Sequence, residues 1–167
     1  MMGAQSNVAM KVSTKSKPYH YVGSGLPNVY LVGVEYSFEP ETGLQAADVP
    51  CLPQLLEALA KALLEKRGLL TSDELRFLRK RLKIASKEFA VLVGVSPEQY
   101  SRLENGATVT ATVDRLVRLL YIAIAKPVAL AAEDVALKTW SAELTHEERI
   151  IATQDEEKHW VVMTKAA

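Results

Sequence analysis

The chain has 167 residues, with 20 basic and 20 acidic side chains, 49% apolar residues and a single Cys. This length suits one domain or two small ones, and the apolar content excludes wholesale disorder. One Cys excludes an intramolecular disulfide and an all-cysteine zinc site, and no run of about 18 apolar residues offers a membrane span. The cysteine count and the lack of a signal peptide lead us to expect a reducing, cytoplasmic compartment.

Charge is distributed unevenly along this neutral chain. Residues 66–106 carry nine basic and five acidic side chains, whereas residues 133–167 carry eight acidic and four basic ones. A basic segment within a neutral chain is typical of a surface that meets phosphate. The alternative is an ordinary solvated helix face.

The first 50 residues predict a tail and a small β region. Residues 1–17 are small, polar and aperiodic, which predicts a disordered tail. Residues 18–50 form the β region, in which aromatic and β-branched residues at 19–22 and 29–36 flank a Gly/Pro/Asn cluster. This pattern predicts an antiparallel strand pair, followed by a turn at 39–43.

Residues 51–126 have helical periodicity. Leucines spaced i, i+3, i+4, i+7 and i+11 predict an amphipathic helix from Leu52 that ends at Gly68. A capping box at Thr71 opens a second helix, with Leu75, Leu78 and Leu82 inward. The pattern then predicts helices over 86–93, 96–105 and 112–125, with stops at Gly94 and Asn105-Gly106.

Residues 127–167 form a C-terminal extension, for which we expect a helix near 132–144 and a hairpin from 150–152 and 160–163. The whole chain is therefore expected to be α+β. A small N-terminal β hairpin and a short C-terminal β hairpin flank a central helical bundle.

Residues 72–121 have the order of a helix-turn-helix, with two short helices around a glycine turn and longer helices on either side. The second short helix is the one that enters a major groove. Tyr100 and Leu103 should face the core, which leaves an exposed polar stripe of Glu98, Ser101, Arg102 and Asn105. Arg102 is the natural reader of guanine on this stripe.

The start of this helix favours phosphate. Ser96 suits the N-cap, Pro97 the first turn and Gln99 the third position, where free backbone N–H groups meet anions. The Glu98 carboxylate can accept a hydrogen bond from a cytosine amine, or it can stabilise the helix by lying near the positive end of the helix dipole. We prefer the second interpretation.

The stretch from Lys83 to Gly106 resembles the Cro/C1-repressor (Xre-type) helix-turn-helix family. The matching residues are Glu88, Ala90, Gly94-Val95-Ser96, Ser101-Arg102, Glu104 and Gly106. The resemblance implies that the position of Ser86, where the family usually has Gln, touches the DNA backbone. Ala85 replaces the usual capping Ser or Thr.

A wider resemblance covers residues 19–126. The segments Tyr19–Leu31, Phe77-Leu78-Arg79-Lys80 and Asp114–Tyr121 are similar to MqsA/YgiT-type antitoxin-like regulators. Zinc-binding members of that group carry two CxxC pairs in the N-terminal strands, and this chain has none there. The resemblance therefore implies the zinc-free branch and a repressor that also captures a toxin protein.

These patterns define a candidate interface with double-stranded DNA. Its residues are Arg76, Lys83, Ser86, Lys87, Ser96, Pro97, Glu98, Gln99, Ser101, Arg102 and Asn105. Arg79 and Lys80 join the pool of candidate phosphate contacts, whereas Glu104 should pair within the domain because phosphate repels a carboxylate.

We expect no metal, no cofactor, no membrane contact and no catalysis. The three histidines are scattered, Cys51 suits a buried position under the leucine helix, and no catalytic motif is present. Two-fold operators and the apolar surplus of residues 119–124 favour a homodimer. The alternative is a protein-interaction module with a largely structural helix-turn-helix, which the residues at 85 and 86 would support.

Overall fold

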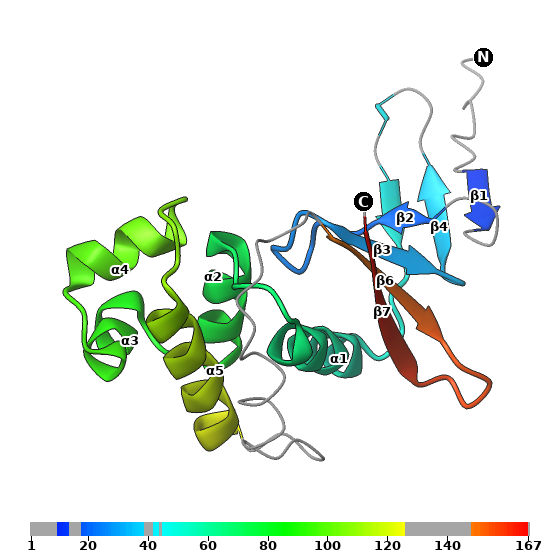
Figure 1. Cartoon of the computed structure of the whole chain (residues 1–167). Helices are drawn as coiled ribbons and strands as arrows, with labels where there is room; N and C mark the ends of the chain where they lie inside the picture. The colour runs from blue at the N-terminus through cyan, green and yellow to red at the C-terminus, as the bar shows by residue number, and fades with distance from the viewer. Residues whose placement is uncertain (1–9, 14–17, 39–41, 44, 126–147, 167) are drawn as a thin grey trace.

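The computed structural model describes residues 10–13, 18–38, 42–43, 45–125 and 148–166. Most of the helices lie together on one side of the molecule and the strands on the other, with the helix Leu52–Glu65 (α1) between them (Figure 1). The expected α+β class, with hairpins near both ends of the chain, is confirmed. No helix in the described part of the chain is long and apolar enough to span a bilayer.

The helices closely follow the expected boundaries. Their bounds are α1 Leu52–Glu65, α2 Ser72–Arg81, α3 Ser86–Val93, α4 Pro97–Glu104 and α5 Ala111–Ala125. The helix expected near 132–144 lies outside the described residues. Thr71 forms the expected capping box, since its hydroxyl accepts from the Glu74 N–H and the Glu74 carboxylate accepts from the Thr71 N–H.

The two terminal hairpins share one sheet. Strands β2 Tyr19–His20, β3 Val29–Val32, β6 Glu148–Gln154 and β7 Trp160–Ala166 lie in the order β2-β3-β6-β7. Strand β3 is antiparallel to β2, as expected, but pairs in parallel with β6. The N-terminal and C-terminal regions therefore form one layer, against which α1 packs.

A second sheet differs from expectation. It contains β1 Met10–Ser13, β4 Glu35–Phe38 and β5 Gln45–Ala47 in the order β1-β4-β5. Residues 10–13 were expected in a disordered tail, and this was wrong, because they pair with β4. The strand expected over 29–36 is divided at Gly33, whose φ of 86° directs the chain into the second sheet.

The position of Cys51 also corrects the sequence interpretation. Cys51 is the residue before α1, in a left-handed conformation with φ 51°, and its side chain is exposed rather than buried under the helix. The start of α1 is held by Trp160 instead, since the Trp160 Nε1 donates to the carbonyl of Pro50 (2.9 Å). This bond connects β7 to the start of α1.

The helical core has the expected inward residues. Leu75, Leu78, Phe89 and Tyr100 are buried, and the rings of Phe89 and Tyr100 meet edge to face with centroids 5.5 Å apart. Leu103 packs against this core, as expected. The side of α4 that carries Tyr100 is therefore fixed inward, and the opposite side faces solvent.

Candidate nucleic-acid interface

The turn before α4 sets the direction of this helix. Gly94 has φ 74°, and the Val95 N–H donates to the carbonyl of Ala90 (3.1 Å), which closes the end of α3. Two residues later the Ser96 hydroxyl accepts from the Gln99 N–H (3.1 Å), and Pro97 begins the helix. Ser96 and Gln99 are exposed, so the start of α4 is open to solvent.

We expect Gly94→Ala to lower the free energy of unfolding by about 1–2 kcal/mol, because a side chain is unfavourable at positive φ. A Cβ there would meet no atom within 4 Å, so the cost comes from the backbone alone. Gly94→Asn should cost less, since Asn tolerates this conformation. Urea unfolding of both variants tests this, and equal losses would show that the left-handed backbone conformation does not determine the cost.

The expected polar stripe on α4 is exposed. Glu98, Ser101, Arg102 and Asn105 all face solvent. Asn105, the residue after α4, is held against the end of this helix, since its Nδ2 donates to the carbonyl of Ser101 (2.7 Å). Among the described residues, none accepts a hydrogen bond from the Arg102 guanidinium. Arg102 therefore keeps its full set of donors available for a ligand.

Glu98 behaves as an N-terminal helix residue. Its own backbone N–H and the Ser96 hydroxyl hold the pKa of the Glu98 carboxyl below its usual range, and the charges of Lys87 and Arg102 lower it further. This favours the helix-dipole interpretation over acceptance from a cytosine amine.

Glu104 holds three helices together. Arg79 of α2 donates to both of its carboxylate oxygens (2.6 and 3.1 Å), and the Ser86 hydroxyl of α3 approaches to 3.4 Å. Arg79 also donates to the carbonyl of Ile84 (2.8 Å). Glu104 therefore pairs within the domain, as expected. The Arg79 guanidinium positions Glu104 and the Ile84 carbonyl, and it is not free to donate to a DNA phosphate.

Arg76 and Ser86 have similar intramolecular contacts. Arg76 donates to the backbone carbonyl of Glu104 and to Asn105 Oδ1 (3.3 Å), and forms an ion pair with Asp73 (3.4 Å). The Gly106 N–H donates to the Ser72 hydroxyl (3.0 Å) next to this group. These contacts fix the end of α4 against the start of α2, and contact of Arg76 or Ser86 with DNA stays a prediction.

Lys83 and Lys87 are exposed around the start of α3. Lys83 lies in the turn between α2 and α3 with φ 58°, a conformation that is strained for any residue with a Cβ. Lys87 lies in the first turn of α3 with regular helix geometry. It is the cleaner position at which to remove a cation from this surface.

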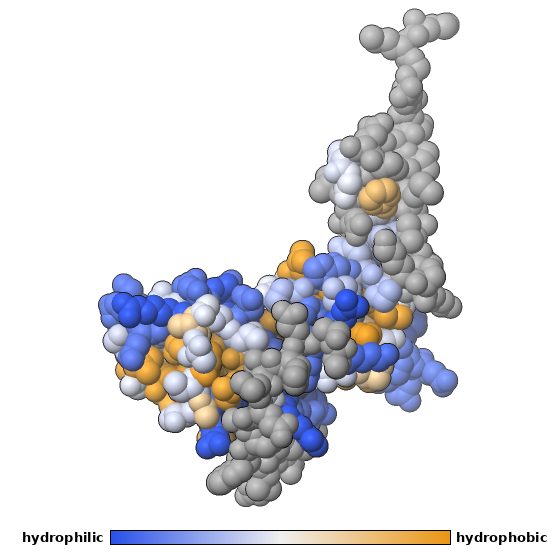
Figure 2. Space-filling model, turned by 45° about the horizontal axis from the view of Figure 1, so that its top comes forward, coloured by the Kyte–Doolittle hydropathy of each residue, from blue (hydrophilic) through white to orange (hydrophobic). Residues whose placement is uncertain are grey.

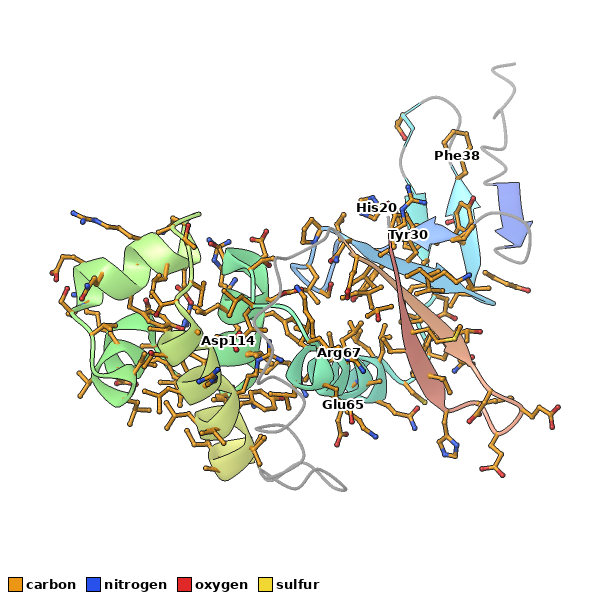
Figure 3. The ribbon with its side chains drawn as sticks, viewed as in Figure 1. His20, Tyr30, Phe38, Glu65, Arg67 and Asp114 are labelled. Carbon is orange, nitrogen blue, oxygen red and sulfur yellow. The ribbon has the colours of Figure 1, made fainter. Side chains whose placement is uncertain are left out.

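A buried cluster that the sequence did not reveal joins α5 to the end of α1. Arg118 of α5 is 1% exposed and pairs with Asp114, one turn earlier (3.0 Å). Its guanidinium also donates to the carbonyls of Leu63, Leu64, Lys66 and Gly68 (2.7–3.0 Å) at the end of α1. Figure 3 shows Asp114 between α5 and α1. The spacing of Asp114 and Arg118 was visible, but it also fits a surface pair.

A family profile described as Helix-turn-helix matches residues 75–120, slightly more than a quarter of the chain. This range begins within α2 and ends within α5, so it contains the Gly94 turn and the whole of α4. No curated protein and no solved structure matches the chain. The chain thus carries a helix-turn-helix domain of the DNA-binding kind, which supports a role in transcription regulation. The geometry of α4 is consistent with that class.

Metal binding was not expected. Among the residues that the structure describes, no three His, Cys, Asp or Glu side chains come together in a group that could hold a metal ion. Elemental analysis of the purified protein remains the test of this expectation.

Proposed function

We propose that this protein is a sequence-specific transcriptional regulator that binds a two-fold DNA operator as a homodimer. The observation that carries the proposal is the arrangement of α4. One side is fixed by Tyr100 and Glu104, and the other presents Arg102 to solvent with no hydrogen-bond acceptor among the described residues. A helix held in this way can enter a major groove as a rigid element. The proposal assigns no catalytic step, metal or cofactor.

An antitoxin role belongs to the same proposal. The resemblance to MqsA/YgiT-type regulators is its support, and a toxin protein would be the second partner. Exposed apolar side chains in the helical part are compatible with such a partner. They include Val91 and Leu92 of α3 and Leu119 and Ile124 of α5, and apolar surface gathers over the helical side in Figure 2. This surface also keeps the alternative, a protein-interaction module, open to test.

Selection of bound duplexes from a random pool tests DNA reading directly. On the selected site, Arg102→Ala should weaken binding by about 1–3 kcal/mol and relax the preference at one base position in each half-site. The reason is the loss of a bidentate pair with guanine. Competition binding of the variant to the selected and the scrambled duplex measures both effects.

Lys87→Ala is the matched comparison, because it removes a cation from the neighbouring helix. It should weaken binding to all sequences alike and lower the slope of log affinity against log salt by about one. Lys61→Ala, on the exposed side of α1, removes the same charge away from α4 and should change neither quantity. If no duplex is enriched, the protein is better described as an interaction module.

A further inference from the structure

Strand β7 ends the four-stranded sheet, and no described residue pairs with its outer edge. It is seven residues long, and Lys165 is its only charged residue. Long edge strands with few charges are templates for pairing with another chain, and natural sheets usually protect them with charges, prolines or bulges. Residues 160–166 contain no proline, and their register with β6 is continuous.

The hairpin geometry shows which backbone groups of β7 are unpaired. The Asp155 N–H donates to the carbonyl of His159 (2.9 Å), so residues 155 and 159 form a hydrogen-bonded pair. Hydrogen-bonded pairs alternate along an antiparallel ladder, so they recur at 153–161, 151–163 and 149–165. The N–H and C=O groups of Val162 and Thr164 are then directed away from β6, towards the open edge.

The side chains of β7 are compatible with self-pairing. Trp160 is buried and Val162 packs against the core, whereas Val161 and Met163 are 42% and 49% exposed on the opposite side of the strand. In an antiparallel pair of β7 strands centred on Met163, Val162 would face Thr164, Val161 would face Lys165, and Met163 would face itself. The lysines of the two copies are not opposite one another, so no like charges meet directly.

We propose that two copies of this chain pair through β7 in this Met163-centred register, forming a continuous eight-stranded sheet. The register is allowed by the backbone, because Val162 and Thr164 have the outward groups and Met163 falls at a non-hydrogen-bonded pair. Two-fold symmetry follows from the self-complementary edge. This proposal rests on the dimeric regulator proposed above. It places the dimer interface on the sheet rather than on the exposed apolar residues of α3 and α5.

Disulfide trapping tests the register. In a Cys51→Ser background, Met163→Cys would place two thiols across the dyad. The Cα atoms of a non-hydrogen-bonded pair lie about 4.5 Å apart, within the range that a disulfide bridges. We expect a glutathione redox buffer to convert most of this variant to a covalent dimer at micromolar concentration.

Val161→Cys in the same background is the matched control, because it lies on the same side of the strand with similar exposure. In the Met163-centred register, the two cysteines at position 161 would lie four residues apart along the strands, or about 14 Å, which is too far for a disulfide. Cross-linking of Met163→Cys and not of Val161→Cys supports the proposal. Equal cross-linking of both variants, or none with Met163→Cys, overturns it.

Sedimentation provides a second measurement that needs no cysteine. Met163→Lys would place two like charges opposite one another at the two-fold axis, so the dimer dissociation constant should rise at least tenfold. Val22→Lys introduces the same charge at an exposed apolar residue outside β7 and should leave the dissociation constant unchanged. Dissociation by Leu119→Lys but not by Met163→Lys would place the dimer on α5 and overturn the proposal. If Met163→Cys cross-links and no duplex is selected, the interface stands and the proposed DNA reader fails.

Discussion

Replacing Arg118 with Met is expected to lower the free energy of unfolding by about 3–5 kcal/mol, the usual loss when one partner of a buried ion pair is removed. Asp114 is 2% exposed and would lose the cation with which it pairs. The carbonyl groups of Leu63, Leu64, Lys66 and Gly68, two of them in buried bonds, would also lose Arg118 as a donor. Urea unfolding followed by circular dichroism measures the loss.

Two further variants separate charge from geometry. Arg118→Lys keeps the cation but lacks the planar fork, so it should recover only part of the stability. Arg118→Met combined with Asp114→Leu removes both charges, but leaves the Leu70 N–H, which donates to Asp114 (2.7 Å), without its acceptor. A loss below about 1 kcal/mol for Arg118→Met alone would mean that water satisfies these groups, and that the cluster does not hold α1 to α5.

Local patterns were sufficient to predict the helices. The capping box at Thr71, the start at Ser96-Pro97 and the stops at Gly94 and Asn105 are each set by neighbours within four residues. These signals are present in the sequence because they act through the backbone of the same segment. The exposure of Arg102 and the burial of Tyr100 followed from the same helical period.

The sheets could not be predicted in the same way. The Asn28 side chain donates to the carbonyl of Glu148, 120 residues later, where β3 and β6 come together in parallel. Nothing local in either strand specifies a partner so far away or the direction of pairing. Strand β5 was missed for a different reason, since Gln45-Ala46-Ala47 lacks the β-branched and aromatic residues by which strands are recognised.

The sequence indicated which side chains of α4 are exposed, but it did not reveal the hydrogen bonds within the candidate site. The sequence suggested DNA-backbone contacts for Arg76, Arg79 and Ser86, because these side chains are basic or polar and lie near the turn. In the structure, all three contact Glu104. Packing between helices decides which basic side chain forms an ion pair with a carboxylate. The spacing of residues along one helix does not contain that information.

Glu104→Gln should therefore have the largest effect within the helix-turn-helix itself, a loss of about 3 kcal/mol in the free energy of unfolding. The amide has nearly the same shape, so the change removes charge without opening a cavity. The side chains of Arg79 and Glu104 are 12% and 7% exposed, so the Arg79 cation would remain largely buried beside a neutral group. Thermal and urea unfolding measure the loss.

DNA binding provides the second measurement for this variant. Glu104 fixes the end of α4 against α2 and α3, so its loss should weaken binding to the selected duplex even well below the melting temperature, although a negative charge has been removed near phosphate. Glu88→Gln, at an exposed glutamate on α3, is the matched control and should leave stability within about 0.5 kcal/mol. If Glu104→Gln instead strengthens binding as a simple change of charge would, Glu104 acts on DNA only through electrostatic repulsion, and the orientation of α4 does not depend on it.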